Sequence, residues 1–164
     1  MLDVRRGSRE AFEELFARHR ESIYGFFRRR VPAEGRPEDL TQETFLAVLR
    51  GANRYEPRAS VRSYLFGIAF NLLSSERRAH QRQQVLAPDR EPAADPISDE
   101  SLWLREALAR LEERDREILM LREYEQLSYS EIAALLRMPV NTVRSRLFRA
   151  RIELKSLLVE GGLR

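Results

Sequence analysis

The sequence predicts an all-α protein with two small helical domains joined by an acidic, proline-containing linker. Apolar residues recur at spacings of three and four in nearly every patterned segment, as they do along one face of a helix. No segment shows the apolar–polar alternation of a strand. The stretch LAPDREPAADPISDE has three prolines and five acids but no helical period, which is typical of an extended linker. We therefore expect domains over residues 1–85 and 101–164, with a linker over residues 86–100.

The N-terminal domain is predicted to hold about three helices. The first follows a cap at Ser8, and its apolar stripe comprises Phe12, Leu15, Phe16, Ile23, Phe26 and Phe27. The second opens at Pro37, ends near Gly51, and turns Phe45, Val48 and Leu49 inward. The third follows a cap at Ser60, and its inward stripe comprises Val61, Tyr64, Leu65, Ile68 and Leu72.

The C-terminal domain contains two helices separated by a tight break. Ser128 and Glu131 form a capping-box pattern at the start of a short helix over residues 129–136. Pro139 supplies a backbone conformation that suits the start of the next helix. The inward residues of that second helix are Thr142, Val143, Leu147 and Ala150. Two helices joined in this way predict a helix-turn-helix, whose second helix lies in the DNA major groove.

The outer face of the second helix is polar and basic. Five basic residues and one acid lie between Asn141 and Lys155. Such a face provides side chains for base edges in its first turns and for phosphates further along. A helical hairpin with a solvated arginine face is the alternative. The expected DNA-facing side chains are those of Arg144, Ser145, Phe148, Arg149 and Arg151.

Composition limits the classes of function that are possible. All basic residues except Lys155 are arginines, which favours phosphate and guanine binding, although a GC-rich genome would also explain it. The formal net charge is only +3, and no cysteine is present to form a disulfide or a thiolate metal site. No apolar run approaches the roughly 20 residues that span a bilayer, and the N-terminus lacks the apolar core of a signal peptide. We expect a soluble, cytoplasmic protein.

Three segments, in order, resemble one bacterial protein family. LSYSEIAALLRMPVNTVRSRLFRAR (residues 127–151) resembles the promoter-reading helix-turn-helix of the sigma-70 family, and most closely that of its extracytoplasmic-function (ECF) subgroup. PEDLTQETFLAVLR (residues 37–50) resembles the segment with which these sigma factors bind a coiled coil of RNA polymerase. SVRSYLFGIAFNLLSSERR (residues 60–78) resembles the helix that reads and melts the minus-ten element.

The resemblance implies three sets of binding residues. Asp39, Gln42, Glu43 and Leu46 share one helix face and would bind polymerase core; an ordinary solvated face is the alternative from spacing alone. Asn141 and Thr142 would join the outer-face residues in minus-thirty-five recognition. Phe66 and Phe70 either stack on bases or pack in the core. The residues expected at the minus-ten element are Asn71, Arg62, Phe70, Asn53 and Arg54.

Four features depart from the family pattern, one of them the SSE run that replaces an aspartate often found after the NL pair. Arg137 and Asn141 stand where glycine is common, so the geometry of the turn is an open question. Tyr64 replaces a common tryptophan in the third helix.

The function implied is promoter-specific transcription initiation without catalysis by this chain. No metal-spaced cluster, phosphate loop or serine–histidine pattern points to an enzyme, and we expect no cofactor. The implied partners are RNA polymerase core, promoter DNA and an anti-sigma factor. A ligand-sensing repressor is the alternative function, and it would not need polymerase to recognise DNA. The linker would pass near the polymerase active site.

Overall fold

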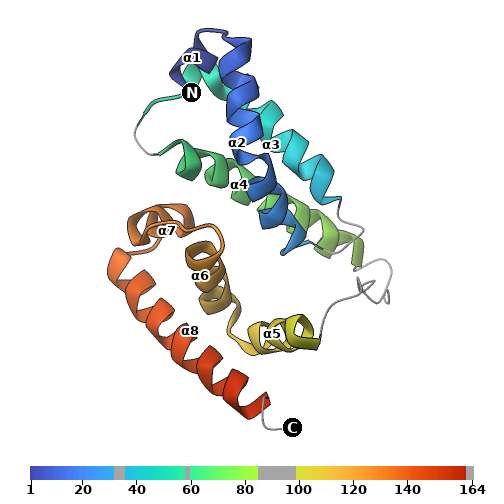
Figure 1. Cartoon of the computed structure of the whole chain (residues 1–164), viewed down its shortest axis with the longest axis vertical. Coiled ribbons are helices and arrows are strands. Elements are labelled where there is room, and N and C mark those ends of the chain that lie inside the picture. The colour runs from blue at the N-terminus through green and yellow to red at the C-terminus, as the bar shows by residue number, and fades with distance from the viewer. Residues whose placement is uncertain (32–35, 58–59, 85–98, 162–164) are drawn as a thin grey trace. The chain divides into compact units, whose positions relative to one another are not determined.

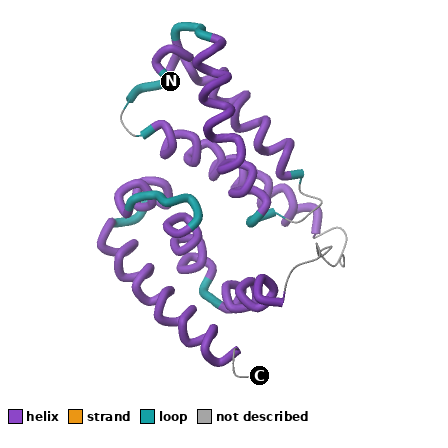
Figure 2. Tube along the Cα trace, viewed as in Figure 1, coloured by secondary structure: helices purple, strands orange, loops and turns teal. Residues whose placement is uncertain are grey.

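The computed structural model describes residues 1–31, 36–57, 60–84 and 99–161, and within these ranges it is helical without strands (Figures 1 and 2). The chain divides into two compact units, Met1–Ala93 and Ala94–Arg164. The all-α, two-domain class is therefore confirmed. Most of the predicted linker lies outside the described residues. Helix α5 already begins at Asp99, so the chain is helical before the predicted linker end at residue 100. The other domain boundaries stay predictions.

The first unit is a bundle in which three long helices contact one another. Its predicted caps are confirmed: the Ser8 hydroxyl accepts from the Ala11 N–H at 3.1 Å, and the Ser60 hydroxyl accepts from the Ser63 N–H at 3.1 Å. Pro37 occupies the first turn of its helix, as predicted. The elements are α1 (Leu2–Arg5), α2 (Arg9–Arg28), α3 (Pro37–Gly51), the 3-10 helix η2 (Ala52–Arg54) and α4 (Val61–Gln84).

Aromatic packing between α2 and α4 forms the centre of this core. The rings of Phe26 and Phe66 lie 5.7 Å apart, and Phe66 is only 1% exposed. Of the two alternatives for Phe66, the structure therefore shows core packing. The predicted stripe of α4 was wrong in part, because Val61, Tyr64, Ile68 and Leu72 are only half-buried and the stripe that packs against α2 is rotated from it. Its fully buried members are Leu65, Phe66, Ala69 and Leu73.

The predicted apolar stripe of α3 was wrong at one residue on its edge. Leu49 was expected to point inward with Phe45 and Val48, but it is 45% exposed. The inward face instead includes two threonines whose hydroxyls donate to backbone carbonyls four residues earlier, so their burial leaves no polar group unpaired. Those threonines are Thr41 and Thr44.

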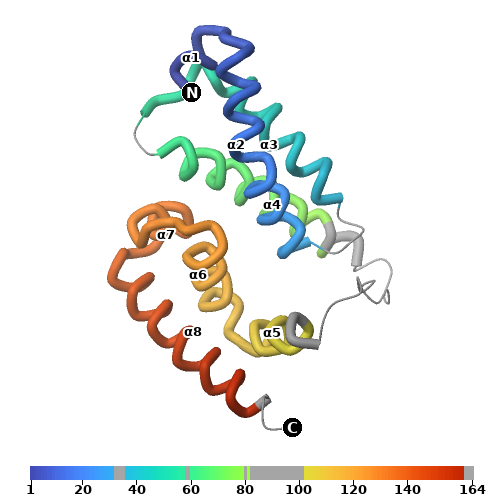
Figure 3. Tube along the Cα trace, in the orientation of Figure 1, coloured from blue at the N-terminus to red at the C-terminus, as the bar shows by residue number. Residues whose placement is uncertain are grey.

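The second unit places one long helix across three shorter ones. Its elements are α5 (Asp99–Arg110), α6 (Glu113–Glu123), α7 (Tyr129–Leu136) and α8 (Val140–Gly161). Helix α8, at the orange-to-red end of the trace in Figure 3, contacts α5, α6 and α7. Val143, Leu147 and Ala150 are buried on its inner face, as predicted, while Thr142 is half-buried.

The helix-turn-helix is held by local hydrogen bonds at both ends of α7. Ser128 and Glu131 form the predicted capping box. At the other end Arg137 adopts the left-handed conformation (φ 53°, ψ 51°). The N–H of Met138 donates to the carbonyl of Ala133 at 3.0 Å, which is the long bond of a Schellman motif. Arg137 therefore takes the conformation that glycine usually supplies.

Helix α8 begins directly after this turn. The carbonyl of Pro139 accepts from the N–H groups of Thr142 at 3.0 Å and Val143 at 3.2 Å. Asn141 lies inside the helix and not in a left-handed turn. Only the first of the two glycine-favouring positions is therefore left-handed in this chain.

Candidate nucleic-acid interface

The outer face of α8 carries the residues predicted to contact the minus-thirty-five element. Asn141, Arg144, Ser145, Phe148 and Arg149 are exposed, opposite the buried stripe of the helix. The Ser145 hydroxyl is bound to the Thr142 carbonyl at 3.1 Å, so it keeps an accepting lone pair for an outside donor. The structure thus brings most of the predicted set onto one face.

Phe148 is the most unusual member of this face. Its side chain is 67% exposed, the highest fraction among the exposed large apolar residues of the described chain. An isolated exposed apolar residue can be incidental, but this one lies between Arg144 and Arg149 on a helix of the type that enters the major groove. An apolar side chain there can contact a thymine methyl group.

The arginines of α8 have different surroundings. Arg149 has no hydrogen-bonding or charged partner among the described residues, so its guanidinium is available. Arg151 instead donates to Glu123 of α6 from Nε at 3.2 Å and from Nη2 at 2.6 Å. These hydrogen bonds raise the pKa of Arg151. Arg151 therefore meets an acid of its own chain at the position where a phosphate contact was predicted.

A tyrosine that the sequence analysis did not single out for binding lies beside this face. The ring centroid of Tyr129 is 5.3 Å from the Arg122 guanidinium carbon and 6.0 Å from that of Arg144. Cations at such distances are attracted to an aromatic face. Tyr129 therefore helps to orient Arg144. No sequence period could reveal this contact, because Arg122 and Arg144 come from different helices.

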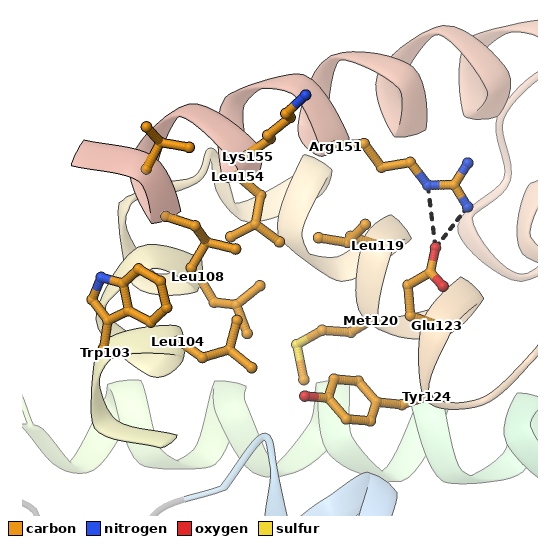
Figure 4. Close-up of a pocket in the computed structure, with 12 residues that line it drawn as sticks. Trp103, Leu104, Leu108, Leu119, Met120, Glu123, Tyr124, Arg151, Leu154 and Lys155 are labelled. Atoms are coloured by element: carbon orange, nitrogen blue, oxygen red, sulfur yellow. Dashed lines mark hydrogen bonds and ion pairs between the residues drawn. The ribbon is translucent and has the colours of Figure 1, made fainter. Parts of the chain in front are cut away.

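An open apolar groove of about 540 Å³ lies between α5, α6 and α8 (Figure 4). The Arg151–Glu123 ion pair stands at one end of it, while the indole of Trp103 lines another part. The remaining lining is mainly aliphatic, and it includes Leu104, Leu108, Leu119, Met120, Leu154 and Leu158.

The predicted minus-ten residues do not gather on one face. Arg62 lies over the ring of the buried Phe66, with its guanidinium carbon 5.5 Å from the centroid. Phe70 is half-buried and Asn71 is exposed. Arg62 and Asn71 are nine positions apart, so they point about 180° away from each other around α4.

Asn53 and Arg54 are both exposed on η2. The next residue, Tyr55, packs its ring edge against Tyr64 of α4 at 5.0 Å, which joins this segment to the first part of the helix. Burial, with the neighbouring Tyr55, raises the pKa of Tyr64. Tyr64 therefore acts as a packing residue at the position where the family often has tryptophan.

The predicted polymerase-binding face of α3 is exposed and more apolar than expected. Leu46 is 49% exposed. Leu49, which was expected to be buried, adds a second exposed apolar side chain. Asp39 pairs with Arg36 at 3.5 Å, and Glu43 pairs with Arg50. Gln42 is exposed beside them. Acids and exposed leucines thus share one helix surface.

The described residues offer no metal site and no membrane span. They contain no group of three or more histidine, cysteine, aspartate or glutamate side chains arranged to hold a metal ion. No helix in the described ranges has both the length and the apolar character of a membrane span.

Both units match sigma-70 families. Residues 15–83 match sigma-70 region 2, and residues 101–154 match sigma-70 region 4. The RNA polymerase sigma factor CarQ of Myxococcus xanthus is 38% identical, over 98% of this chain and 96% of its own length. The ECF RNA polymerase sigma-E factor of Salmonella typhimurium is 34% identical, over 90% of this chain and 86% of its own.

A solved structure gives the same result for the fold. CnrH, solved in complex with the cytosolic domain of CnrY, has a TM-score of 0.72 and 26% identity over 96% of this chain and 94% of its own. Two family matches in the expected order, together with full-length relatives, establish what the chain is. It belongs to the ECF subgroup of the sigma-70 family, whose non-catalytic members bind RNA polymerase core and direct promoter-specific initiation of transcription.

Proposed function

We propose that this sigma factor divides its work among three surfaces. The outer face of α8 reads the minus-thirty-five element, one region of α4 and η2 captures the minus-ten strand, and the exposed face of α3 docks on polymerase core. The exposed phenylalanine between two arginines on α8 is the observation that carries the proposal furthest. The proposed minus-thirty-five residues are Asn141, Thr142, Arg144, Ser145, Phe148, Arg149 and Arg151.

The α8 surface matches the chemistry of a major groove. Arg149 is unpaired among the described residues and can make a forked contact with guanine, which is the commonest specific arginine contact to DNA. Arg144 is held by the Tyr129 ring, which lowers the entropy lost on binding. Phe148 supplies an apolar contact. Arg151 would exchange Glu123 for a phosphate or keep the acid, so its contribution to affinity is the smallest of the three arginines.

The minus-ten surface is centred on Asn71. Its exposed amide can donate to and accept from the edge of an unpaired base. Because Arg62 points to the opposite side of α4, we assign it to the phosphate backbone or to packing over Phe66, and not to the same base. Phe70 offers a partly exposed ring for stacking. Asn53 and Arg54 form a separate polar surface near the start of the helix.

The α3 surface suits a helix of the polymerase that combines apolar and basic side chains. Asp39 and Glu43 supply negative charge, Gln42 supplies an amide, and Leu46 supplies apolar contact area. The exposure of Leu49 supports the same assignment, because two leucines on one face bury more area than one.

A cytoplasmic location and control by an anti-sigma factor complete the proposal. The location follows from the partner, because bacterial RNA polymerase works in the cytoplasm. The similar CnrH has been solved with the cytosolic domain of CnrY, which supports a protein partner of this kind for the present chain.

Run-off transcription tests the assignment of the surfaces. Core polymerase is combined with this protein and a library of promoter fragments, and the enriched sequences define the two elements. Each surface is then changed separately through Arg149→Ala, Asn71→Ala and Leu46→Ala. We expect the first two variants to lose discrimination at one element each, and the third to lose core binding for every promoter. Equal loss at both elements in Arg149→Ala would contradict the assignment of α8.

A further inference from the structure

We infer that Arg146 is a positioning residue for DNA recognition: it locks the rotation of α8 so that the reading side chains face the major groove. The inference rests on the proposed role of α8. Arg146 lies within the basic segment of the helix, yet its side chain is only 24% exposed. Its Nη1 donates to Oδ1 of Asp115 at 2.6 Å and also to Glu112. It is therefore an internal cation within a helix of otherwise more exposed arginines.

The two acids that hold Arg146 are at the start of α6. Glu112 is the N-cap of that helix, and its carboxylate also accepts from the N–H of Arg114 at 3.4 Å. Asp115 lies in the first turn, and its side chain is only 7% exposed. The guanidinium thus joins two points on α6 to one point on α8, across 31 and 34 residues of sequence. We call Arg146, Asp115 and Glu112 together the clamp. The hydrogen bonds that Arg146 donates to Asp115 and Glu112 raise its pKa, so the clamp stays charged.

The position of Arg146 along the helix explains why this clamp controls recognition. Arg144 and Phe148 lie two residues before and after it, and thus about 200° around the helix axis from it. Fixing Arg146 against α6 therefore fixes those two side chains in the opposite direction. A rotation of about 15° would move the helix surface, some 5 to 6 Å from the axis, by about 1.5 Å. A shift of that size takes a forked hydrogen bond out of range.

A phosphate contact by Arg146 fits the structure less well. Swinging the guanidinium out to DNA would leave Asp115 buried without its partner, and an unpaired buried charge is strongly unfavourable. Arg149, which has no partner in the described part of the chain, already provides a cation on the outer face. The clamp therefore contributes to sequence specificity and not to DNA affinity. It keeps the outer face of α8 directed at the major groove, and Arg146 itself does not contact DNA.

The test measures sequence discrimination by the holoenzyme, assembled from core polymerase and the full chain. The probes are duplexes that carry the enriched minus-thirty-five sequence or a scrambled one, with the minus-ten element unchanged. The variants are Arg146→Gln, which removes the cation, and Asp115→Asn, which weakens the clamp from the side that does not face DNA. Arg110→Gln is the matched control, because it breaks a more exposed ion pair with Glu160 that joins α5 to α8. Circular dichroism confirms folding at the assay temperature.

We expect both clamp variants to lower the ratio of matched to scrambled affinity about tenfold, with the salt dependence unchanged. Arg146→Lys, which keeps the positive charge but replaces the planar guanidinium with an ammonium group, should restore part of the ratio. Unchanged ratios in folded variants would overturn the inference. So would a salt slope reduced by about 0.9 in Arg146→Gln, since that is the effect of losing one phosphate contact. Higher affinity of Asp115→Asn for all sequences would overturn it as well.

The wild-type arm separates this inference from the proposed function. A wild-type holoenzyme without any minus-thirty-five preference would contradict the role of α8 and the clamp together. A wild-type preference that survives both clamp variants would contradict the clamp alone.

Discussion

Two phenylalanines on the proposed DNA-binding helices have opposite surroundings. Phe66 of α4 is 1% exposed and packs against α2, whereas Phe148 of α8 is 67% exposed. Both lie beside arginines in helices that resemble promoter readers. The comparison shows that the first unit packs its aromatic residue in the core, while the second leaves one exposed. An aromatic residue in a basic helix is therefore assigned by its packing and not by its neighbours in sequence.

The difference extends to how each surface is held. In the second unit, α8 is tied to α6 by Arg146 and Arg151, and Arg144 lies over Tyr129. In the first unit, Asn71 is exposed on α4 and points about 180° away from Arg62 around the helix axis. The second surface is thus preorganised by charged contacts. The first depends on the apolar core that sets the position of α4 itself.

The largest effect should come from Phe66→Ala. Removing a fully buried phenylalanine typically costs about 3–5 kcal/mol of unfolding free energy. Denaturant unfolding followed by circular dichroism measures this loss. The matched control Phe148→Ala should change stability by no more than about 0.5 kcal/mol, because its side chain is exposed. Similar losses of unfolding free energy in the two variants would contradict the different roles assigned to the two phenylalanines.

Arg149→Ala should have the next largest effect, on binding and not on folding. A lost forked base contact costs about 1–3 kcal/mol of discrimination at one base pair. Holoenzyme binding to single-base variants of the minus-thirty-five element measures it. A uniform loss for all sequences, with a smaller salt slope, would make Arg149 a phosphate contact instead. Lys155→Ala, a change further along α8, provides the control.

Arg137→Gly should stabilise the second unit. The left-handed conformation costs a non-glycine residue roughly 1–2 kcal/mol, and part of that gain is lost to the greater entropy of glycine in the unfolded chain. We expect a net increase of about 0.5–1 kcal/mol, measured by thermal unfolding. Arg137→Ala, which keeps the steric conflict, should bring no such gain. A destabilised glycine variant would show that the Arg137 side chain has an unrecognised contact.

The smallest effect concerns pH and the first unit. Burial, aided by Arg62 and Arg18, lowers the pKa of His19 below its ordinary value of 6.5. The unfolded chain then binds a proton more readily than the folded one, so stability is complete above pH 6.5 and decreases as the pH falls through that value. Unfolding measured between pH 7.5 and 5.5 should show this decrease. His19→Gln should flatten the profile, and an unchanged slope would assign the effect elsewhere.

Helix starts and the helix-turn-helix could be predicted from the sequence. The Ser8, Ser60 and Ser128 caps, the first-turn Pro37 and the break before Pro139 were all confirmed. Each of these signals acts within about four residues, so the chain carries the necessary partners locally. The short helix α1 was missed because four residues are too few to show a period.

The α8 outer face was also determined by the sequence. Its apolar stripe of Val143, Leu147 and Ala150 leaves no choice about which side is buried, because the stripe is continuous and the opposite side is strongly basic. Exposure of Arg144, Ser145, Phe148 and Arg149 followed directly. The family resemblance then supplied the promoter element that this face would read.

Only the tertiary structure decided the residues at stripe edges and the partners of the arginines. Phe66 could have stacked on bases or packed in the core, and Leu49 was expected to be buried but is exposed, because neighbouring helices, and not the period of their own helix, determine what an edge position contacts. Arg146 and Arg151 are held by acids of α6 that lie about 30 residues earlier in the chain. A helical period gives the direction of a side chain, but the packing of other helices decides whether that direction ends in solvent, an apolar core or a charge.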